Sequence, residues 1–240
     1  MEQTIPKLNT SKLGSGIGLL NEKPLHASLK QWYAQPGDRF EVAVDGFVID
    51  IVRDNQLLEI QTGNFAAIKS KLTKLASSHP IRIIYPIAQE KWIVKLSKDE
   101  GKANTRRKSP KKGHVEDVFW EMVRLPQLIS NRNFSLEVLM IQAEEVRRFE
   151  KNRRWRRNGW CTEERRLLDV VDRHLLKTPA DWLAFLPEGM ETFTTKEIAD
   201  TLNIRRELAQ KMAYALRTAQ LIELIGKRGR GNLYRVSVQT

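Results

Sequence analysis

Two carboxylates occupy facing positions of a predicted β-hairpin. The segment VIDIVRDNQLLEIQTGNF, residues 48–65, alternates apolar and polar residues around Asp54-Asn55, a pair suited to a two-residue turn. Counting outward from this turn places Asp50 opposite Glu59, and opposed residues on neighbouring strands point to the same face. Two acids held side by side in this way could share a bound cation.

A second turn extends this row to a third acid. Asp45-Gly46 forms the preceding turn, and the same counting puts Glu41 against Asp50. Like charges directly opposite each other are destabilising, so the row predicts a compensating cation or raised pKa values. Hard divalent cations, Mg²⁺ above all, bind such oxygen ligands. The alternative is that the acids face water, and that Glu41 pairs with a nearby Arg or Lys.

The predicted strands lie between two predicted helices. Upstream, a helix is expected over residues 22–34, with an apolar stripe made of Leu25, Leu29, Trp32 and Tyr33. Downstream, a helix that begins near Phe65 is followed by the apolar run PIRIIYPIA, residues 80–88, which is typical of a buried strand. The predicted order is helix, three strands, helix, strand.

This order, with an acid on the first helix, an Asp on the second strand and an acid-x-Gln on the third, resembles the core of the PD-(D/E)xK nuclease superfamily. The resemblance covers about residues 14–96 and implies an αβββαβ restriction-endonuclease-like core, an α/β fold with a mixed sheet. It makes Glu22 the helix acid that orients a water or completes a second metal site, Asp50 and Glu59 metal ligands, and Gln61 the replacement of the usual lysine. The chain as a whole is also similar to an uncharacterised bacterial family.

The resemblance implies metal-assisted hydrolysis of a phosphodiester. Mg²⁺ or Mn²⁺ held by Asp50, Glu59 and the Ile60 carbonyl would polarise the phosphoryl oxygen and lower the pKa of an attacking water. Glutamine at position 61 is a departure, because it cannot carry the charge of the usual lysine. Either the metal alone supplies that charge or a neighbour does, and Lys69 on the next helix is our candidate.

The charge of the chain favours an anionic partner. Its 240 residues carry 41 Lys and Arg against 29 Asp and Glu, a formal net charge of +12, which favours nucleic acid through the release of counterions. A basic chain can also meet a membrane surface, but we find no run of about 18 apolar residues and no signal peptide. The single Cys161 excludes an internal disulfide and fits a reducing cytoplasm. We expect a cytoplasmic protein that binds DNA or, alternatively, RNA, and no membrane.

The middle of the chain combines a predicted loop, an extension of the core and a basic segment. Residues 97–117 are charged and broken by Gly and Pro, so we expect an exposed loop whose cations contact phosphates or water. Residues 115–129 predict an amphipathic helix and residues 134–146 a strand. Within residues 147–160, the candidates for phosphate and base contacts are Arg153, Arg154, Trp155, Arg156 and Arg157. Alternatively, the tryptophans of this segment anchor it to the core.

The C-terminal third predicts a second module. Thr194-x-x-Glu197 is a capping box that starts a short helix, a turn near Asn203 leads to a longer helix, and residues 221–238 predict two strands with a basic, Gly-rich tip. With a helix predicted at residues 163–176, this order resembles a winged helix-turn-helix over about residues 162–240. The resemblance puts Arg205, Arg206, Gln210 and Lys211 in the major groove of DNA, and Lys227, Arg228 and Arg230 at its backbone. Winged helices also act as protein-interaction modules.

We therefore expect a nuclease-like domain at residues 1–160 and a winged-helix domain at residues 161–240. Within the first, residues 14–96 are the core, residues 97–117 the basic loop and residues 118–160 the extension. The expected function is a Mg²⁺-dependent endonuclease of DNA whose winged helix binds or orients the substrate. The alternative is a non-catalytic DNA-binding regulator, whose degenerate nuclease-like domain serves as a structural or homodimerisation unit. RNA cleavage is a third option.

Overall fold

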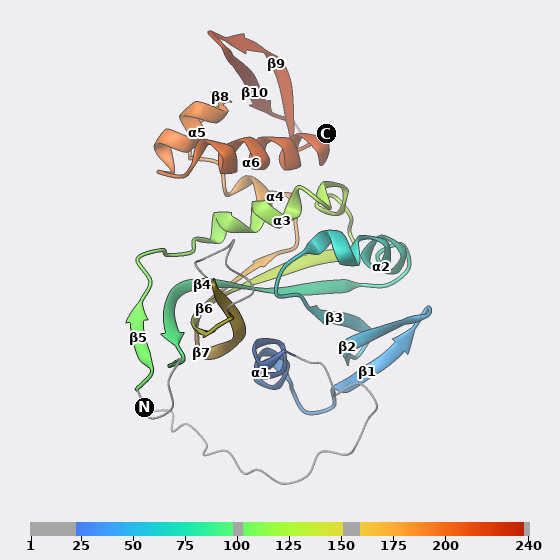
Figure 1. Cartoon of the computed structure of the whole chain (residues 1–240). Coiled ribbons are helices and arrows are strands. Elements are labelled where there is room, and N and C mark those ends of the chain that lie inside the picture. Colours follow the sequence, from blue (N-terminus) through green and yellow to red (C-terminus); the bar gives the residue numbers. More distant parts are fainter. Residues whose placement is uncertain (1–22, 98–102, 151–158, 238–240) are drawn as a thin grey trace, which may run out of the picture.

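The computed structural model describes residues 23–97, 103–150 and 159–237. Within these residues, a seven-stranded sheet carries one helix on one face and several short helices on the other, and a three-stranded sheet with further helices lies beyond those (Figure 1). The expected α/β class with a mixed sheet is confirmed. No helix in the described part of the chain is long and apolar enough to cross a membrane.

The predicted order of the first elements is confirmed. They are α1 (Pro24–Tyr33), β1 (Arg39–Val44), β2 (Phe47–Arg53), β3 (Gln56–Ile60), η2 (Phe65–Ile68), which continues as α2 (Lys69–Leu75), and β4 (Ile81–Lys95). Asp45 and Gly46 both have the positive φ that a tight hairpin turn of this kind requires, with φ of 49° and 83°. The register is therefore as predicted from the turns: Val44 faces Phe47, and Arg53 faces Gln56.

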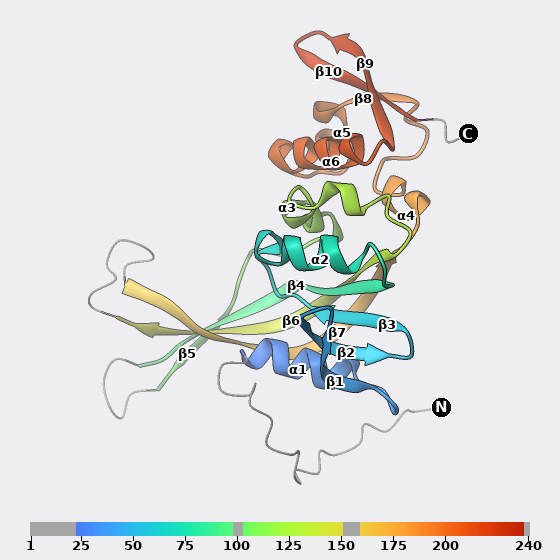
Figure 2. The same ribbon diagram turned by 90° about the vertical axis from the view of Figure 1, so that its right-hand side faces the viewer.

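Three further strands complete the large sheet. They are β5 (Thr105–Lys108), β6 (Phe134–Phe149) and β7 (Trp160–Leu176). The order is β1-β2-β3-β4-β6-β7, with β5 paired to β4. The pairs β3–β4 and β4–β6 are parallel and the others are antiparallel, which makes the sheet mixed. One end of β4, β5, β6 and β7 extends beyond the helices (Figure 2).

Two predicted elements in the middle of the chain are wrong. The segment expected as a loop contains β5, because its backbone pairs with the long strand β4. The single helix expected over residues 115–129 is divided into η3 (Val115–Val118), α3 (Phe119–Met122) and η4 (Pro126–Leu128). Proline disfavours helical backbone at the residue before it, and Leu125 accordingly has φ of −134°.

The helix predicted at residues 163–176 is also wrong, because this segment is most of strand β7. Its apolar doublets suggested helical spacing, but β7 has register shifts against β6 that leave Leu168 and Val171 without a partner. In the first two doublets one residue, Leu167 or Val170, packs against the α1 side of the sheet, while the other is exposed. The bulges therefore give this strand buried apolar residues at a spacing that resembles the spacing in a helix.

Apolar side chains cover both faces of the large sheet. On one face, Leu25, Leu29 and Tyr33 of α1 pack against the sheet. On the other, α2 and α3 cover a larger core that continues into the C-terminal elements. Trp32, predicted on the buried stripe of α1, is instead 43% exposed, because residues spaced by four already complete the buried row. Its ring stands 5.6 Å from the guanidinium of Arg173.

The C-terminal elements form the smaller sheet and its helices. They are α4 (Pro179–Leu183), β8 (Thr192–Thr194), α5 (Thr195–Thr201), α6 (Arg206–Thr218), β9 (Ile222–Arg228) and β10 (Gly231–Val236). The predicted capping box at the start of α5 is confirmed. The hydroxyl of Ser130 donates to the carbonyl of Ala219 over 2.6 Å, which links the segment after η4 to the end of α6. The boundary expected between residues 160 and 161 falls inside β7, a strand of the large sheet.

Candidate functional site

The strands β2 and β3 separate at Asp50 and Glu59. Their backbone pairing runs from Arg53 and Gln56 to Ile51 and Leu58 and ends there, whereas β3 stays paired with β4 as far as Ile60. At this point the Ile60 N–H donates to Oδ2 of Asp50 over 2.8 Å. The two carboxylates predicted to face each other therefore lie together where the strands part.

Asp50 contacts a histidine that was not among the predicted site residues. Nε2 of His26, on the first turn of α1, lies 3.2 Å from Oδ2 of Asp50. Burial by itself would raise the pKa of Asp50, but the hydrogen bond and charge of His26, the Ile60 N–H and Lys30 outweigh it and lower the pKa. Asp50 is therefore kept as an anion in a largely buried position.

Glu59 has one satisfied and one unsatisfied oxygen. The residue is only 7% exposed, and its Oε1 accepts a hydrogen bond from Nζ of Lys71 over 2.6 Å. Within the described residues, no hydrogen-bond donor reaches the buried Oε2. Burial, followed by the charge of Asp50, raises the pKa of Glu59 in spite of Lys71. A buried carboxylate oxygen without a donor is costly, and a cation is one partner that would satisfy it.

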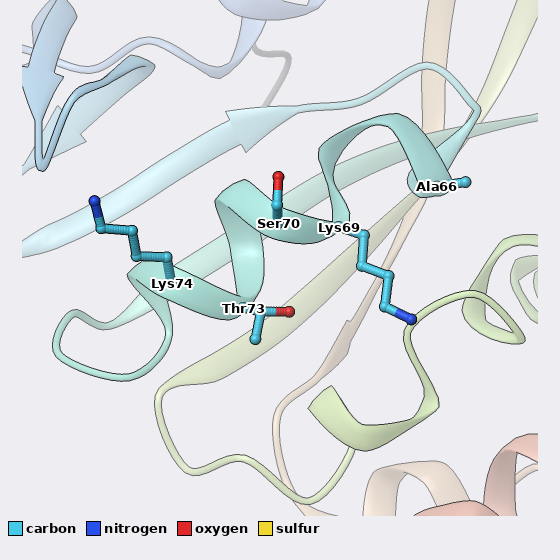
Figure 3. A pocket seen from close by; sticks show the side chains of 5 residues that line it. All are labelled: Ala66, Lys69, Ser70, Thr73 and Lys74. Carbon is cyan, nitrogen blue, oxygen red and sulfur yellow. The ribbon is translucent and has the colours of Figure 1, made fainter.

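The lysine beside the carboxylates is Lys71 and not Lys69. Lys69 is exposed and, together with Ala66, Ser70, Thr73 and Lys74, lines an open hollow beside α2 (Figure 3). Lys71 instead lies three residues after Ile68 and four before Leu75, on the side of α2 that faces the sheet. That helical spacing was the signal in the sequence that could have identified it.

The other candidates at this end of the sheet lie differently. The side-chain amide of Gln61 donates to the carbonyl of Gly63 and, over 3.4 Å, to that of Asn64, so it braces the loop after β3. Glu41 has a φ of 51°, which takes it out of the strand row. Its side chain pairs with Lys30, as the alternative interpretation expected, so the row of three acids is reduced to two. Glu22 lies outside the described residues.

Asp50 and Glu59 are the two described residues that could hold the magnesium ion predicted from the sequence. Mg²⁺ keeps several waters and is often held by only one or two carboxylates together with substrate phosphates. No group of three or more His, Cys, Asp and Glu side chains with the spacing of a metal site occurs among the described residues. The unsatisfied Oε2 of Glu59, next to the anionic Asp50, is the atom that such an ion would satisfy. The carbonyl predicted as a further ligand belongs to Ile60, whose N–H donates to Asp50.

The predicted nucleic-acid contacts in and directly before α6 include exposed side chains and one side chain that packs against α3. Arg205, Arg206 and Gln210 are exposed. Lys211 is turned toward α3, with Nζ 5.1 Å from the centre of the Trp120 ring. It therefore links α6 to α3 and is not on the exposed side of α6.

The tip of the β9–β10 hairpin is also basic. Lys227 and Arg230 are exposed, whereas Arg228 pairs with Glu197 over 2.7 Å and donates to Thr192 over 2.9 Å. The candidates Arg153, Arg154, Trp155, Arg156 and Arg157 lie outside the described residues.

Comparisons with known proteins place these residues in a family. Residues 23–177 match the model of a family described as a domain of unknown function (DUF8091). A protein of Treponema pallidum (strain Nichols), described as an uncharacterized protein, is 29% identical over 224 residues, which cover 91% of this chain and 87% of that protein. No solved structure matches the chain significantly. The matched segment runs from α1 to the end of β7 and includes His26, Asp50, Glu59 and Lys71.

Proposed function

We propose a function for this chain, which belongs to the DUF8091 family: it is a metal-dependent endonuclease that hydrolyses phosphodiester bonds in DNA. The observation that carries the proposal is the unsatisfied, buried oxygen of Glu59 beside Asp50, at the point where β2 and β3 separate. The order of α1, three strands, α2 and β4 supports it, because it is similar to the core of PD-(D/E)xK nucleases.

Each residue of the site has a role in this proposal. Asp50 and Glu59, with the Ile60 carbonyl, would hold Mg²⁺ or Mn²⁺. The ion would polarise a phosphoryl oxygen and lower the pKa of a water bound to it. His26 keeps Asp50 ionised and oriented. Lys71 supplies the positive charge that Gln61 cannot carry. This charge would stabilise the negative charge that develops on the phosphate.

We further propose that β8, α5, α6, β9 and β10 form a winged helix-turn-helix that binds DNA. Arg206 and Gln210 lie on the exposed side of α6, and Lys227 and Arg230 lie at the hairpin tip. In this type of module the second helix of the pair enters the major groove while the wing contacts the backbone. The module would recruit or orient the substrate.

The alternative is a DNA-binding regulator without catalysis. The ion pair between Lys71 and Glu59 favours it, because an ammonium group can neutralise a buried carboxylate in place of a metal ion. The turn of Gln61 toward Gly63 also fits this alternative. In a regulator, the large sheet and the helices that cover it would form a structural or dimerisation unit.

A cleavage assay separates the two functions. Purified full-length protein is incubated with linear duplex, single-stranded and branched DNA and with RNA, in Mg²⁺, Mn²⁺ or EDTA. We expect cleavage of DNA that requires the metal and is lost in Asp50→Ala and Glu59→Ala. Asp200→Ala, which removes an exposed acid of α5, serves as the matched control and should keep the wild-type rate. Metal-independent cleavage, or full activity of Asp50→Ala, would contradict the nuclease proposal.

A further inference from the structure

Four strands of the large sheet extend past its helices and form an arm. We define the arm as residues 90–95, 105–108, 142–149 and 160–166, which belong to β4, β5, β6 and β7 (Figure 2). Between Ala143 and Val146 the four strands are paired without a shift, and β7 bulges at Glu163 before the pairing resumes at Arg147 and Thr162, so each paired side chain can be assigned to one face of the arm. Ala143 fixes the assignment, because it packs in the apolar cluster beneath α1.

The face of the arm on the α1 side is strongly basic. The register places Lys91 beside Ala143, and Lys95, Arg107, Arg147 and Arg165 follow on the same face. Among the described residues of the arm, Glu145 is the one acid on this face. We call the five cations Lys91, Lys95, Arg107, Arg147 and Arg165 the basic face.

Side-chain contacts agree with this assignment. Glu145, which is 1% exposed, binds Lys91 over 3.0 Å and Arg147 over 2.7 Å. Burial would raise the pKa of Glu145, but these two cations lower it to about 2. One anion thus serves two cations. Arg107 and Arg165 are exposed beside them.

The opposite face of the same arm is electrically balanced. Arg106 binds Glu144 and Lys108 binds Glu90, each over 2.6 Å. Arg148 and Arg166 are likewise paired, with Glu163 and Glu164. The basic charge of the described arm is therefore concentrated on the α1 side, although cations occur on both faces.

A cavity lies at the end of the basic face that is nearest to α1. It has a volume of about 160 Å³, and Lys91 and Arg165 line it together with Leu25 and Thr62. Leu25 precedes His26 and Thr62 follows Gln61 in the chain. Lys91 and Arg165 therefore share this cavity with the chain neighbours of His26, which contacts Asp50, and of Gln61.

We propose that the basic face binds the phosphate backbone of a DNA strand and leads it past this cavity toward His26 and Asp50, at the end of the sheet where β2 and β3 separate. The inference rests on the proposed function for the identity of the substrate. Phosphates favour such a surface because neutralising them releases condensed counterions, and because guanidinium groups bind phosphate oxygens in pairs. The balanced face offers no comparable gain, since each contact there would first break an ion pair.

Neighbouring arginines on opposite faces provide a matched test. Arg107→Gln with Arg165→Gln changes the basic face, and Arg106→Gln with Arg166→Gln changes the other. Both double variants lose two exposed positive charges from the same strands, so the overall charge is equal. Binding of labelled single-stranded and duplex DNA is followed by fluorescence anisotropy in EDTA over a series of NaCl concentrations, with the intact full-length protein.

We expect the basic-face variant to bind about tenfold or more weakly. The slope of its log affinity against log salt should flatten by about 1 to 2, as expected for the loss of up to two phosphate contacts. The control variant should stay within about twofold of wild type. Equal losses in both variants, or no loss in the first, would overturn the inference. If a double variant does not fold by circular dichroism, Arg107→Gln and Arg106→Gln alone give the same comparison.

The assay also distinguishes this inference from the nuclease proposal. Selective loss of binding without any metal-dependent cleavage by the wild type would keep the basic face and reject the nuclease. Cleavage by the wild type, with equal binding by the two double variants, would keep the nuclease and reject the basic face. Failure of the wild type to bind either DNA would reject both.

Discussion

Nζ of Lys71 lies 2.6 Å from Oε1 of Glu59 and also donates to the carbonyl of Val48 over 2.6 Å. One lysine of α2 therefore bridges β2 and β3 at the end of the sheet where the two strands separate. The lysine is linked to the carboxylate that has an unsatisfied second oxygen. The link between α2 and the sheet and the proposed catalysis therefore both depend on the side chain of Lys71.

Replacing Lys71 should affect both stability and rate. Lys71→Met leaves Glu59 buried without its cation, and removal of one partner of a buried ion pair costs about 3 kcal/mol. Loss of a fixed positive charge at the phosphate should lower the single-turnover rate by about 10²-fold or more. Lys69→Met, on the exposed side of α2, should change the free energy of unfolding by less than about 0.5 kcal/mol and leave the rate unchanged. Urea denaturation and single-turnover cleavage measure the two effects, and equal behaviour of the two variants would contradict the role of Lys71.

As the pH rises, the wild type should lose stability relative to the Glu59→Gln variant. Burial and the charge of Asp50 raise the pKa of Glu59 in the folded protein above its ordinary value of 4.5. The folded state then binds more protons than the unfolded state, so the contribution of Glu59 to stability is lost as the pH rises from about 4.5 through the folded pKa. Urea midpoints of both proteins between pH 4 and pH 7 provide the difference. A difference that grows in favour of the wild type as the pH rises would show that Lys71 dominates instead.

A divalent cation should stabilise the wild type through its carboxylates. At a concentration of 100 times its Kd, Mn²⁺ or Mg²⁺ should add about 2.7 kcal/mol to the free energy of unfolding and raise the Tm, because it binds the folded state alone. Asp50→Ala and Glu59→Ala should show much smaller increases, whereas Asp200→Ala should respond as the wild type does. Thermal melts with and without EDTA give the comparison. An equal rise in the Asp50 and Glu59 variants would place the ion elsewhere.

The two sides of α6 should have different roles. Arg206→Ala combined with Gln210→Ala should weaken duplex binding, because both side chains are exposed on the proposed groove side. Lys211→Ala should leave binding nearly unchanged and lower stability by about 0.5–1 kcal/mol, because its ammonium group packs over Trp120. Binding at fixed salt and urea denaturation separate the two effects. Weaker binding in Lys211→Ala alone would mean that this side of α6 reaches DNA.

The parts of the fold that the sequence predicted correctly are those set by local rules. Asp45 and Gly46 adopt the left-handed conformation that their hairpin turn requires, and the register of β1 and β2 follows from that turn. The capping box at Thr194 and Glu197 starts α5 in the same way. Such signals involve residues within a few positions of one another, so the sequence displays them directly.

The contacts that define the site depend on tertiary packing instead. His26 reaches Asp50 across 24 residues and Lys71 reaches Glu59 across 12, each because a helix packs on the sheet. Gln61 was expected beside the metal, but the loop after β3 offers its amide the carbonyl of Gly63. The helical spacing of Lys71 from Ile68 and Leu75 places it on the side of α2 that faces the sheet, but no spacing rule specifies that it meets Glu59 at the end of β3.

The last prediction tests whether Lys71 has replaced the lysine usually found at the position of Gln61. If it has, adding Gln61→Lys to the Lys71→Met variant should return a positive charge to the position directly after β3. The single-turnover rate of this double variant should then be at least about tenfold higher than that of Lys71→Met. Gln61→Met in the same Lys71→Met background is the control, because it removes the amide without adding charge and should recover nothing. A lysine at position 61 could instead donate to the carbonyls of Gly63 and Asn64, which the glutamine amide now contacts, and the double variant would then stay as slow as Lys71→Met. Single-turnover rates at saturating Mg²⁺ distinguish these outcomes, and a wild-type rate in Lys71→Met itself would leave the metal as the sole source of positive charge at the phosphate.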